Sequence, residues 1–128
     1  MKDALNILIV DDEPSVAQSL IFVLNGPSGP RCKLTSVADG EEALAKMDAT
    51  ACPFDLVMTD NNMPRINGLE LVRELRARKF SGKILVLSAH LSEENTQAYQ
   101  ELSVDTLMPK PFDIGELRRT ISALANAA

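Results

Sequence analysis

The stretch ILIVDD, residues 7 to 12, decides the fold class because it places four apolar residues directly before two aspartates. Short continuous apolar runs rich in β-branched residues are typical of parallel strands that helices cover on both faces. Two similar runs follow at residues 56–58 (LVM) and 84–87 (ILVL). We therefore expect an α/β protein with a buried parallel sheet.

Two weaker strand candidates, residues 32–38 and 104–108, are interrupted by polar residues and so suit the edges of the sheet. Segments with helical period separate all the strand candidates, and such alternation produces a parallel sheet with right-handed crossovers. Placing the weak strands at the edges gives the order 2-1-3-4-5. The expected fold is a flavodoxin-like three-layer (βα)5 sandwich with a five-stranded parallel sheet, which binds ligands at the carboxyl ends of its strands.

Each expected helix begins with a recognisable start signal. Proline suits the first helical turn, and a capping residue followed three positions later by glutamate forms a capping box. A serine at the start of the most polar segment is a further capping candidate. These signals are Pro14, the pairs Asp39/Glu42, Asn67/Glu70 and Asp113/Glu116, and Ser92.

The size and charge of the chain limit its class. A length of 128 residues predicts one domain, residues 1–128, large enough for a core without metal or disulfide support. The 13 basic and 18 acidic side chains give a net charge of −5, with one Tyr and no Trp to stack on bases. Direct binding of nucleic acid is therefore not expected.

The two cysteines, Cys32 and Cys52, are too few for a secreted disulfide scaffold and lack the spacing of a zinc site. We interpret both as structural thiols in a reducing compartment. The sequence has no charged-then-apolar leader and no apolar stretch of about 18 residues that could span a bilayer. We expect a cytoplasmic protein with no membrane insertion.

Polar residues follow the predicted strands at their carboxyl ends: Asp11, Asp12, Asp60, Ser88 and Lys110. At an effective dielectric of about 20, two carboxylates some 4 Å apart repel each other by about 4 kcal/mol, so a cation must lie among them. Carboxylate oxygens are hard ligands, which suit Mg²⁺. Lys110 supplies a second positive charge, and the prolines on both sides of it restrict its backbone. A divalent cation, a lysine and a hydroxyl around one carboxylate favour transfer of a phosphoryl group to it, with Asp60 as the candidate nucleophile.

Taken one at a time, these residues also have ordinary structural interpretations. Asp12 or Glu13 would cap the helix that begins at Pro14, and Lys110 or Ser88 would be a solvated turn residue. Their joint occurrence at strand ends, in the expected strand order, favours a common site.

At this point the sequence resembles the receiver domains of two-component response regulators, similar to a chemotaxis regulator. The resemblance covers the whole chain and depends on four motifs: ILIVDDEPS at 7–15, TDNNMPRINGLEL at 59–71, LSAH at 87–90 and PKPF at 109–112. It implies that Asp60 accepts a phosphoryl group from a phosphohistidine on a histidine kinase or a histidine phosphotransfer protein. It leaves the downstream protein or fused output domain open.

The resemblance also implies roles for the neighbouring residues. Asp12, Asp60 and the main-chain carbonyl of Asn62 would ligate Mg²⁺ directly, and Asp11 would act largely through water. Ser88 would donate a hydrogen bond to the phosphoryl group and Lys110 would form an ion pair with it. Ala89 would leave the group access, and the peptide bond between Lys110 and Pro111 would be cis.

Two departures from the family pattern affect signalling more than phosphorylation. Leu107 stands where the family usually has Tyr or Phe, and residues 102–104 replace a common Gly-Ala pair before the last strand.

Asn62 and His90 flank the expected site, and our hypothesis is that their side chains set the lifetime of the phosphorylated state.

Three other classes fit the sequence less well. A phosphatase with an aspartyl nucleophile would need an Asp-x-Asp pair and a cap over its substrate, and a flavin carrier would need a Ser/Thr/Gly-rich phosphate loop. A binding-only pseudo-receiver would lack some of the acidic residues, all of which are present. We expect a phosphorylation-activated signalling switch and not an enzyme with an external substrate.

Overall fold

The computed structural model describes residues 5–24, 32–49, 54–61, 66–88, 92–110 and 113–126. Within these residues five strands alternate with five helices, as the sequence predicts. In chain order they are β1 (Leu5–Val10), α1 (Pro14–Leu24), β2 (Cys32–Val37), α2 (Gly40–Ala49), β3 (Leu56–Asp60), α3 (Gly68–Ala77), β4 (Lys83–Ser88), α4 (Glu93–Glu101), β5 (Thr106–Pro109) and α5 (Ile114–Asn126).

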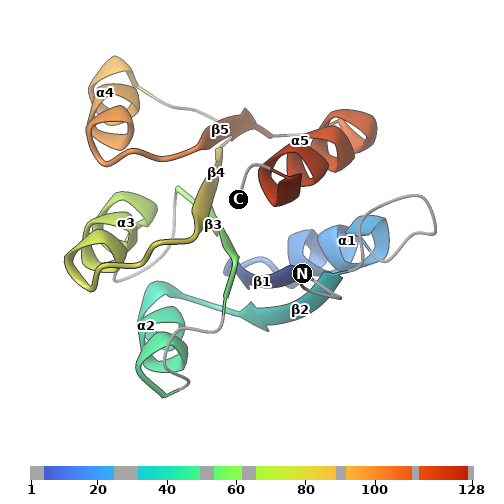
Figure 1. The fold of residues 1–128 in the computed structure, drawn as a ribbon, viewed down its shortest axis with the longest axis horizontal. Coiled ribbons are helices and arrows are strands. Elements are labelled where there is room, and N and C mark those ends of the chain that lie inside the picture. Colours follow the sequence, from blue (N-terminus) through green and yellow to red (C-terminus); the bar gives the residue numbers. More distant parts are fainter. Residues whose placement is uncertain are drawn as a thin grey trace.

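The strands form one parallel sheet in the order β2-β1-β3-β4-β5, which confirms the predicted order. Figure 1 shows α1 and α5 on one face of this sheet and α2, α3 and α4 on the other, so the molecule has three layers. The weakly apolar strands β2 and β5 lie at the two edges, where each has a single neighbour in the sheet.

The alternation of side chains along the central strands builds two separate cores. Ile7 and Ile9 of β1 belong to the cluster under α1 and α5, whereas Leu8 and Val10 belong to the cluster under α2, α3 and α4. Successive residues of a strand point to opposite faces, so a continuous apolar run supplies both layers. This explains why the run at residues 7–10 shows no polar alternation.

The predicted start signals act at the helix ends that they mark. At α3 the Asn67 side chain accepts a hydrogen bond from the Glu70 N–H at 2.9 Å, and Glu70 accepts one from the Asn67 N–H at 3.4 Å. Ser92 in the same way accepts from the Asn95 N–H at 3.0 Å and caps α4. Each cap satisfies a backbone donor that has no partner within its own helix.

The predicted start of the fifth strand was wrong. The pattern placed this strand at residues 104–108, and the structure places it at Thr106–Pro109. The reason is local hydrogen bonding: the Val104 N–H donates to the Tyr99 carbonyl at the end of α4, and the Asp105 side chain accepts from the Ile84 N–H. These two residues therefore belong to the turn that follows α4.

Among the described residues no helix is both long enough and apolar enough to cross a membrane.

Gly68, the first residue of α3, allows this helix to approach the end of β3 very closely. Its N–H donates to the Asn61 carbonyl at 3.0 Å. A Cβ added there would lie 2.5 Å from the Asp60 carbonyl oxygen and 2.8 Å from the Tyr99 hydroxyl. The packing at this point has no space for a side chain.

We expect Gly68→Ala to lower the free energy of unfolding by about 1–3 kcal/mol, because the added methyl group overlaps backbone atoms that cannot move independently. Urea denaturation measures this change. Gly115→Ala is the matched control, since an added Cβ there would meet side-chain atoms of Arg119 and Asp113, both at 3.3 Å, and not the backbone of another element. The control should be as stable as the native protein or more stable by up to about 1 kcal/mol, and an equally stable Gly68→Ala would contradict the close approach.

Candidate functional site

Polar residues gather where the central strands and β5 end. Asp11 directly follows β1, Asp60 ends β3, Ser88 ends β4 and Lys110 directly follows β5. The strand register brings them together, because Ser88 pairs with Pro109 and the Lys110 N–H donates to the Ser88 carbonyl at 2.9 Å. The carboxyl edge of the sheet thus collects the residues that the sequence predicts there.

Four carboxylates form a cluster at this edge: Asp11, Asp12, Glu13 and Asp60. Each offers one oxygen, and these oxygens all lie within 4.8 Å of one another. Asp11 and Asp60 are buried, whereas Asp12 and Glu13 are exposed. Such a set of hard oxygen donors is typical of a site for a divalent cation such as Mg²⁺. Glu13 was not predicted as a member, although it continues the acidic run after β1.

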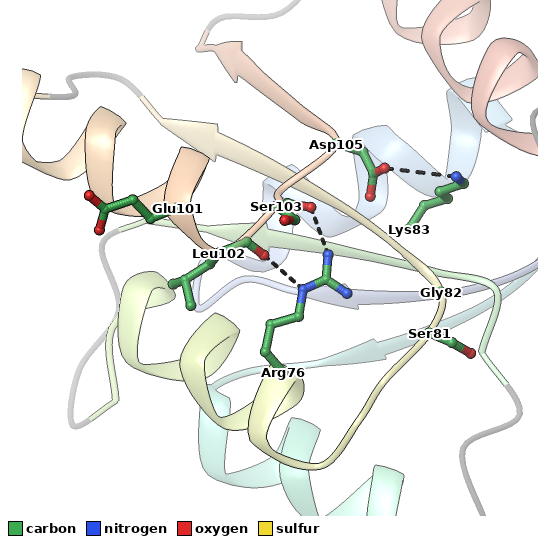
Figure 2. Close-up of a pocket in the computed structure, with 8 residues that line it drawn as sticks. All are labelled: Arg76, Ser81, Gly82, Lys83, Glu101, Leu102, Ser103 and Asp105. Atoms are coloured by element: carbon green, nitrogen blue, oxygen red, sulfur yellow. Dashed lines mark hydrogen bonds and ion pairs between the residues drawn. The ribbon is translucent and has the colours of Figure 1, made fainter.

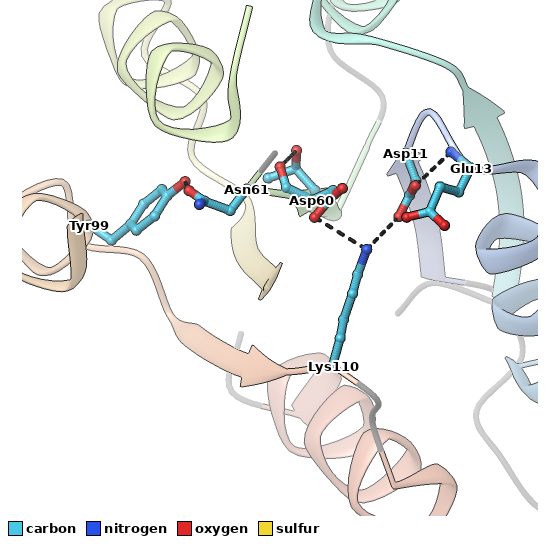
Figure 3. A network of polar contacts seen from close by, with 7 residues as sticks. Asp11, Glu13, Asp60, Asn61, Tyr99 and Lys110 are labelled. Carbon is cyan, nitrogen blue, oxygen red and sulfur yellow. Dashed lines mark hydrogen bonds and ion pairs between the residues drawn. The ribbon is translucent and has the colours of Figure 1, made fainter. Parts of the chain in front are cut away.

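Lys110 places its ammonium between the two buried carboxylates. Figure 3 shows Nζ of Lys110 reaching Oδ2 of Asp11 and Oδ1 of Asp60, each at 3.2 Å. Burial by itself would lower the pKa of Lys110, but the hydrogen bonds and charges of Asp11 and Asp60 outweigh it and raise the pKa above its ordinary value. Lys110 is therefore a fixed positive charge at this site.

Asp11 also shapes the turn after β1. Its Oδ1 accepts a hydrogen bond from the Glu13 N–H at 2.8 Å while its Oδ2 contacts Lys110. Asp12 or Glu13 was the alternative capping residue here, but it is the Asp11 carboxylate that accepts this backbone donor. The carboxylates of Asp12 and Glu13 meanwhile lie exposed within the acidic cluster.

The backbone at Asp60 and Asn61 is held from several sides. The Thr59 hydroxyl donates to the Asp60 carbonyl at 3.0 Å. The Asn61 N–H donates to the Leu87 carbonyl of β4 at 3.0 Å, and the Asn61 carbonyl accepts from the Gly68 N–H of α3. The peptide that follows the candidate nucleophile is thus attached to both a strand and a helix.

A buried polar pair next to Asp60 was missed by the reasoning from sequence. The Tyr99 hydroxyl on α4 donates to Oδ1 of Asn61 at 2.5 Å, and both side chains are buried. Figure 3 shows this pair on the opposite side of Asp60 from Lys110. Burial, and then the negative charge of Asp60, raise the pKa of Tyr99 well above its ordinary value. Two features of the sequence could have indicated this pair: Asn61 is a polar residue directly after a buried strand, and Tyr99 is a tyrosine on an otherwise polar helix.

Several predictions concern residues outside the described part of the chain: those for Cys52, Asn62, Ala89, His90 and the Lys110–Pro111 peptide bond.

The other cysteine, Cys32, is described, and it is half-buried on the edge strand β2. Burial raises the pKa of its thiol and so disfavours the reactive thiolate.

A separate surface hollow lies at the opposite, amino edge of the sheet. Its lining includes residues 81–83 before and at the start of β4, and Asp105 before β5, as Figure 2 shows. Lys83 and Asp105 form an ion pair there at 3.9 Å. Because Asp60, Ser88 and Lys110 lie at the carboxyl ends of their strands, the hollow is not part of the acidic site.

Comparisons with known proteins agree with this geometry. The chain matches the family model described as response regulator receiver domain over residues 7–122. The alkaline phosphatase synthesis transcriptional regulatory protein PhoP of Bacillus subtilis is 36% identical over 118 residues, which cover 92% of this chain and 47% of that protein. The chain therefore spans about half the length of the curated relatives that it matches.

Solved structures similar to this chain include a chemotaxis protein and a receiver domain. The chemotaxis protein CheY4 of Vibrio cholerae is 31% identical with a TM-score of 0.82, covering 94% of this chain and 98% of that one. A Francisella response regulator receiver domain is 27% identical with a TM-score of 0.84, covering 96% and 98%.

The raised pKa of Tyr99 predicts a loss of stability at alkaline pH. The folded state holds the phenol proton more tightly than the unfolded state, whose tyrosine has a pKa of about 10. The stability that the neutral phenol contributes is therefore complete below about pH 10 and falls as the pH rises further, by at most about 1.4 kcal/mol per pH unit. We expect urea denaturation to show a steeper alkaline loss in the native protein than in Tyr99→Phe, which keeps the ring. Equal slopes would contradict the burial of the hydroxyl.

Proposed function

This chain belongs to the family of response regulator receiver domains, and we propose that it is a phosphorylation-activated signalling switch whose phosphoacceptor is Asp60. The observation that carries the proposal is the ammonium of Lys110 at 3.2 Å from the Asp60 carboxylate, inside a cluster of acidic side chains. A fixed cation beside a buried carboxylate stabilises the negative charge that develops on a transferring phosphoryl group.

The proposed reaction moves a phosphoryl group from a phosphohistidine to Asp60. A carboxylate oxygen of Asp60 attacks phosphorus, the new P–O bond forms, and the P–N bond breaks. The imidazole nitrogen leaves with the bonding electron pair and takes up a proton. Lys110 forms an ion pair with the transferred group, and the Ser88 hydroxyl at the end of the adjacent strand β4 donates a hydrogen bond to it.

We assign Mg²⁺ as the metal of the acidic cluster. The donor set fits this ion, since oxygens of four carboxylates lie within 4.8 Å of one another and two of these side chains are exposed to water. Asp12, Asp60 and the main-chain carbonyl of Asn62 would hold it directly, with Asp11 acting through water. When bound, Mg²⁺ supplies positive charge that neutralises phosphoryl oxygens.

The proposed partners follow from this chemistry. The donor is a histidine kinase or a histidine phosphotransfer protein, and the exchange takes place in the cytoplasm. The output comes from a separate downstream protein or from a fused domain, since relatives such as the transcriptional regulatory protein PhoP are about twice as long as this chain. Phosphorylation adds charge at Asp60 and shifts the equilibrium between two conformations of the receiver.

The central test is phosphorylation by a small donor. Incubation with Mg²⁺ and acetyl phosphate should raise the intact mass by one phosphoryl group, and Asp60→Asn should show no gain. Asp48→Asn is the matched control, because Asp48 is an exposed aspartate on α2 that pairs with Arg78 away from the site. This control should gain the same mass as the native protein. No gain in the native protein, or a gain that persists in Asp60→Asn, would overturn the proposal.

Metal binding is tested without any phosphodonor. Mg²⁺ at 100 times its dissociation constant should stabilise the native protein by about 2.7 kcal/mol over the chelated protein, since it binds only the folded state. Chemical denaturation with Mg²⁺ or with EDTA measures this difference. Asp12→Asn should lose at least half of it and Asp48→Asn should keep all of it. An Asp12→Asn variant with the full effect would contradict the assigned ligands.

A further inference from the structure

Helix α4 has few apolar anchors. Of its nine residues, Tyr99 alone is buried, whereas α3 buries Leu71, Val72 and Leu75 along one face. Most of the stability of a helix in a protein comes from packing of an apolar face. The position of α4 therefore depends strongly on what holds Tyr99.

The hydroxyl of Tyr99 is held by Asn61. Its ring packs in the apolar cluster between the sheet and helices α2 to α4, and its O–H donates to the Asn61 side chain. Leu107 of β5 packs against the same cluster and has no polar group. Loss of this hydrogen bond would remove the side-chain partner that the amide oxygen and the hydroxyl have among the described residues, and a buried polar group without a partner is unfavourable inside a protein.

Asn61 is in turn the residue directly after Asp60. Its backbone N–H and carbonyl are bonded to Leu87 of β4 and Gly68 of α3. A Cβ on Gly68 would lie 2.9 Å from the Asn61 Cα, so Asn61 and the start of α3 are in close contact. A displacement of the peptide between Asp60 and Asn61 also changes the direction of the Asn61 side chain, because both are joined to the Asn61 Cα.

The carboxyl end of α4, which follows Tyr99 closely in the chain, has a further attachment to α3. Arg76 of α3 donates from Nε to the Leu102 carbonyl at 2.8 Å and from Nη2 to the Ser103 carbonyl at 2.7 Å, as Figure 2 shows. Ser103 has a φ of 59°, a left-handed conformation that is uncommon for a residue other than glycine. These bonds hold the carboxyl end of the helix to α3 independently of Tyr99, so loss of the Tyr99 hydroxyl contact would leave this end attached while the rest of α4 loses its buried polar anchor.

We propose that the hydrogen bond between Tyr99 and Asn61 links the state of Asp60 to the position of α4. The inference rests on the proposed function of Asp60 as phosphoacceptor. In the unphosphorylated protein the bond holds α4 against the sheet. Phosphorylation of Asp60 moves the peptide before Asn61 and breaks the hydrogen bond between Asn61 and Tyr99. Helix α4 then moves away from the sheet while its carboxyl end stays bound to Arg76. Tyr99 is a positioning residue, since it does not touch the phosphoryl group.

Hydrogen exchange of the α4 amides, read by mass spectrometry with and without Mg²⁺ and acetyl phosphate, tests this link. In the native protein, phosphorylation should speed exchange in α4 by about fivefold, the effect expected from one neutral hydrogen bond. Tyr99→Phe should exchange at the faster rate before any phosphodonor is added, and phosphorylation should change it little. Its gain of phosphoryl mass should equal that of the native protein.

The control variants separate the hydrogen bond from general effects on the helix. Asn61→Leu removes the acceptor and should reproduce Tyr99→Phe, and the double variant should add nothing further. Thr96→Val removes another hydroxyl of α4, one that donates to the Ser92 carbonyl within the helix. It should keep the full response to phosphorylation.

The native protein also carries an internal probe, because Tyr99 is its single tyrosine and it has no tryptophan. Its tyrosine emission should change when Asp60 is phosphorylated. If Tyr99→Phe gains phosphoryl mass and α4 still responds as in the native protein, the inference is overturned and the proposed function stands. If the native protein gains no mass, the proposed function fails and this inference fails with it.

Discussion

The ion pairs of Lys110 with Asp11 and Asp60 are the interaction on which the rest of the site depends. The two carboxylates are buried at the ends of adjacent strands, and without a cation their repulsion would be about 4 kcal/mol at a separation near 4 Å. Lys110 lies within 3.2 Å of both and offsets this repulsion. The carboxylates of Asp12 and Glu13 are exposed and form the side of the cluster that faces water.

The fold supplies this arrangement because parallel strands end at the same edge of the sheet. The central strands are buried on both faces and cannot shift register without exposing a core, so Asp11, Asp60 and Ser88 at their carboxyl ends have fixed positions. Close packing at Gly68 brings α3 against the end of β3. The surroundings of Asp60 therefore include a strand on each side and a helix N-terminus, with α4 attached through Tyr99.

Much of the fold was predictable from the sequence because strand burial and helix capping are local properties. The apolar runs indicated which strands are central, and Asn67 with Glu70 marked the start of α3 correctly. The bond between Tyr99 and Asn61 was not predictable, since it joins residues far apart in the chain and depends on how α4 is rotated on the sheet. The start of β5 was predicted too early because Val104 and Asp105 belong to the turn after α4, where they form hydrogen bonds with Tyr99 and Ile84.

The residue that accepts the phosphoryl group, assigned here as Asp60, can be identified directly. Sodium borohydride reduces an acyl phosphate to an alcohol, so treatment of the phosphorylated protein followed by peptide sequencing identifies the residue that carried the phosphoryl group. We expect reduction at residue 60 alone, with Asp11 and Asp12 recovered as aspartate. Reduction at Asp11 or Asp12, or a phosphorylated protein in which residue 60 remains aspartate, would contradict it.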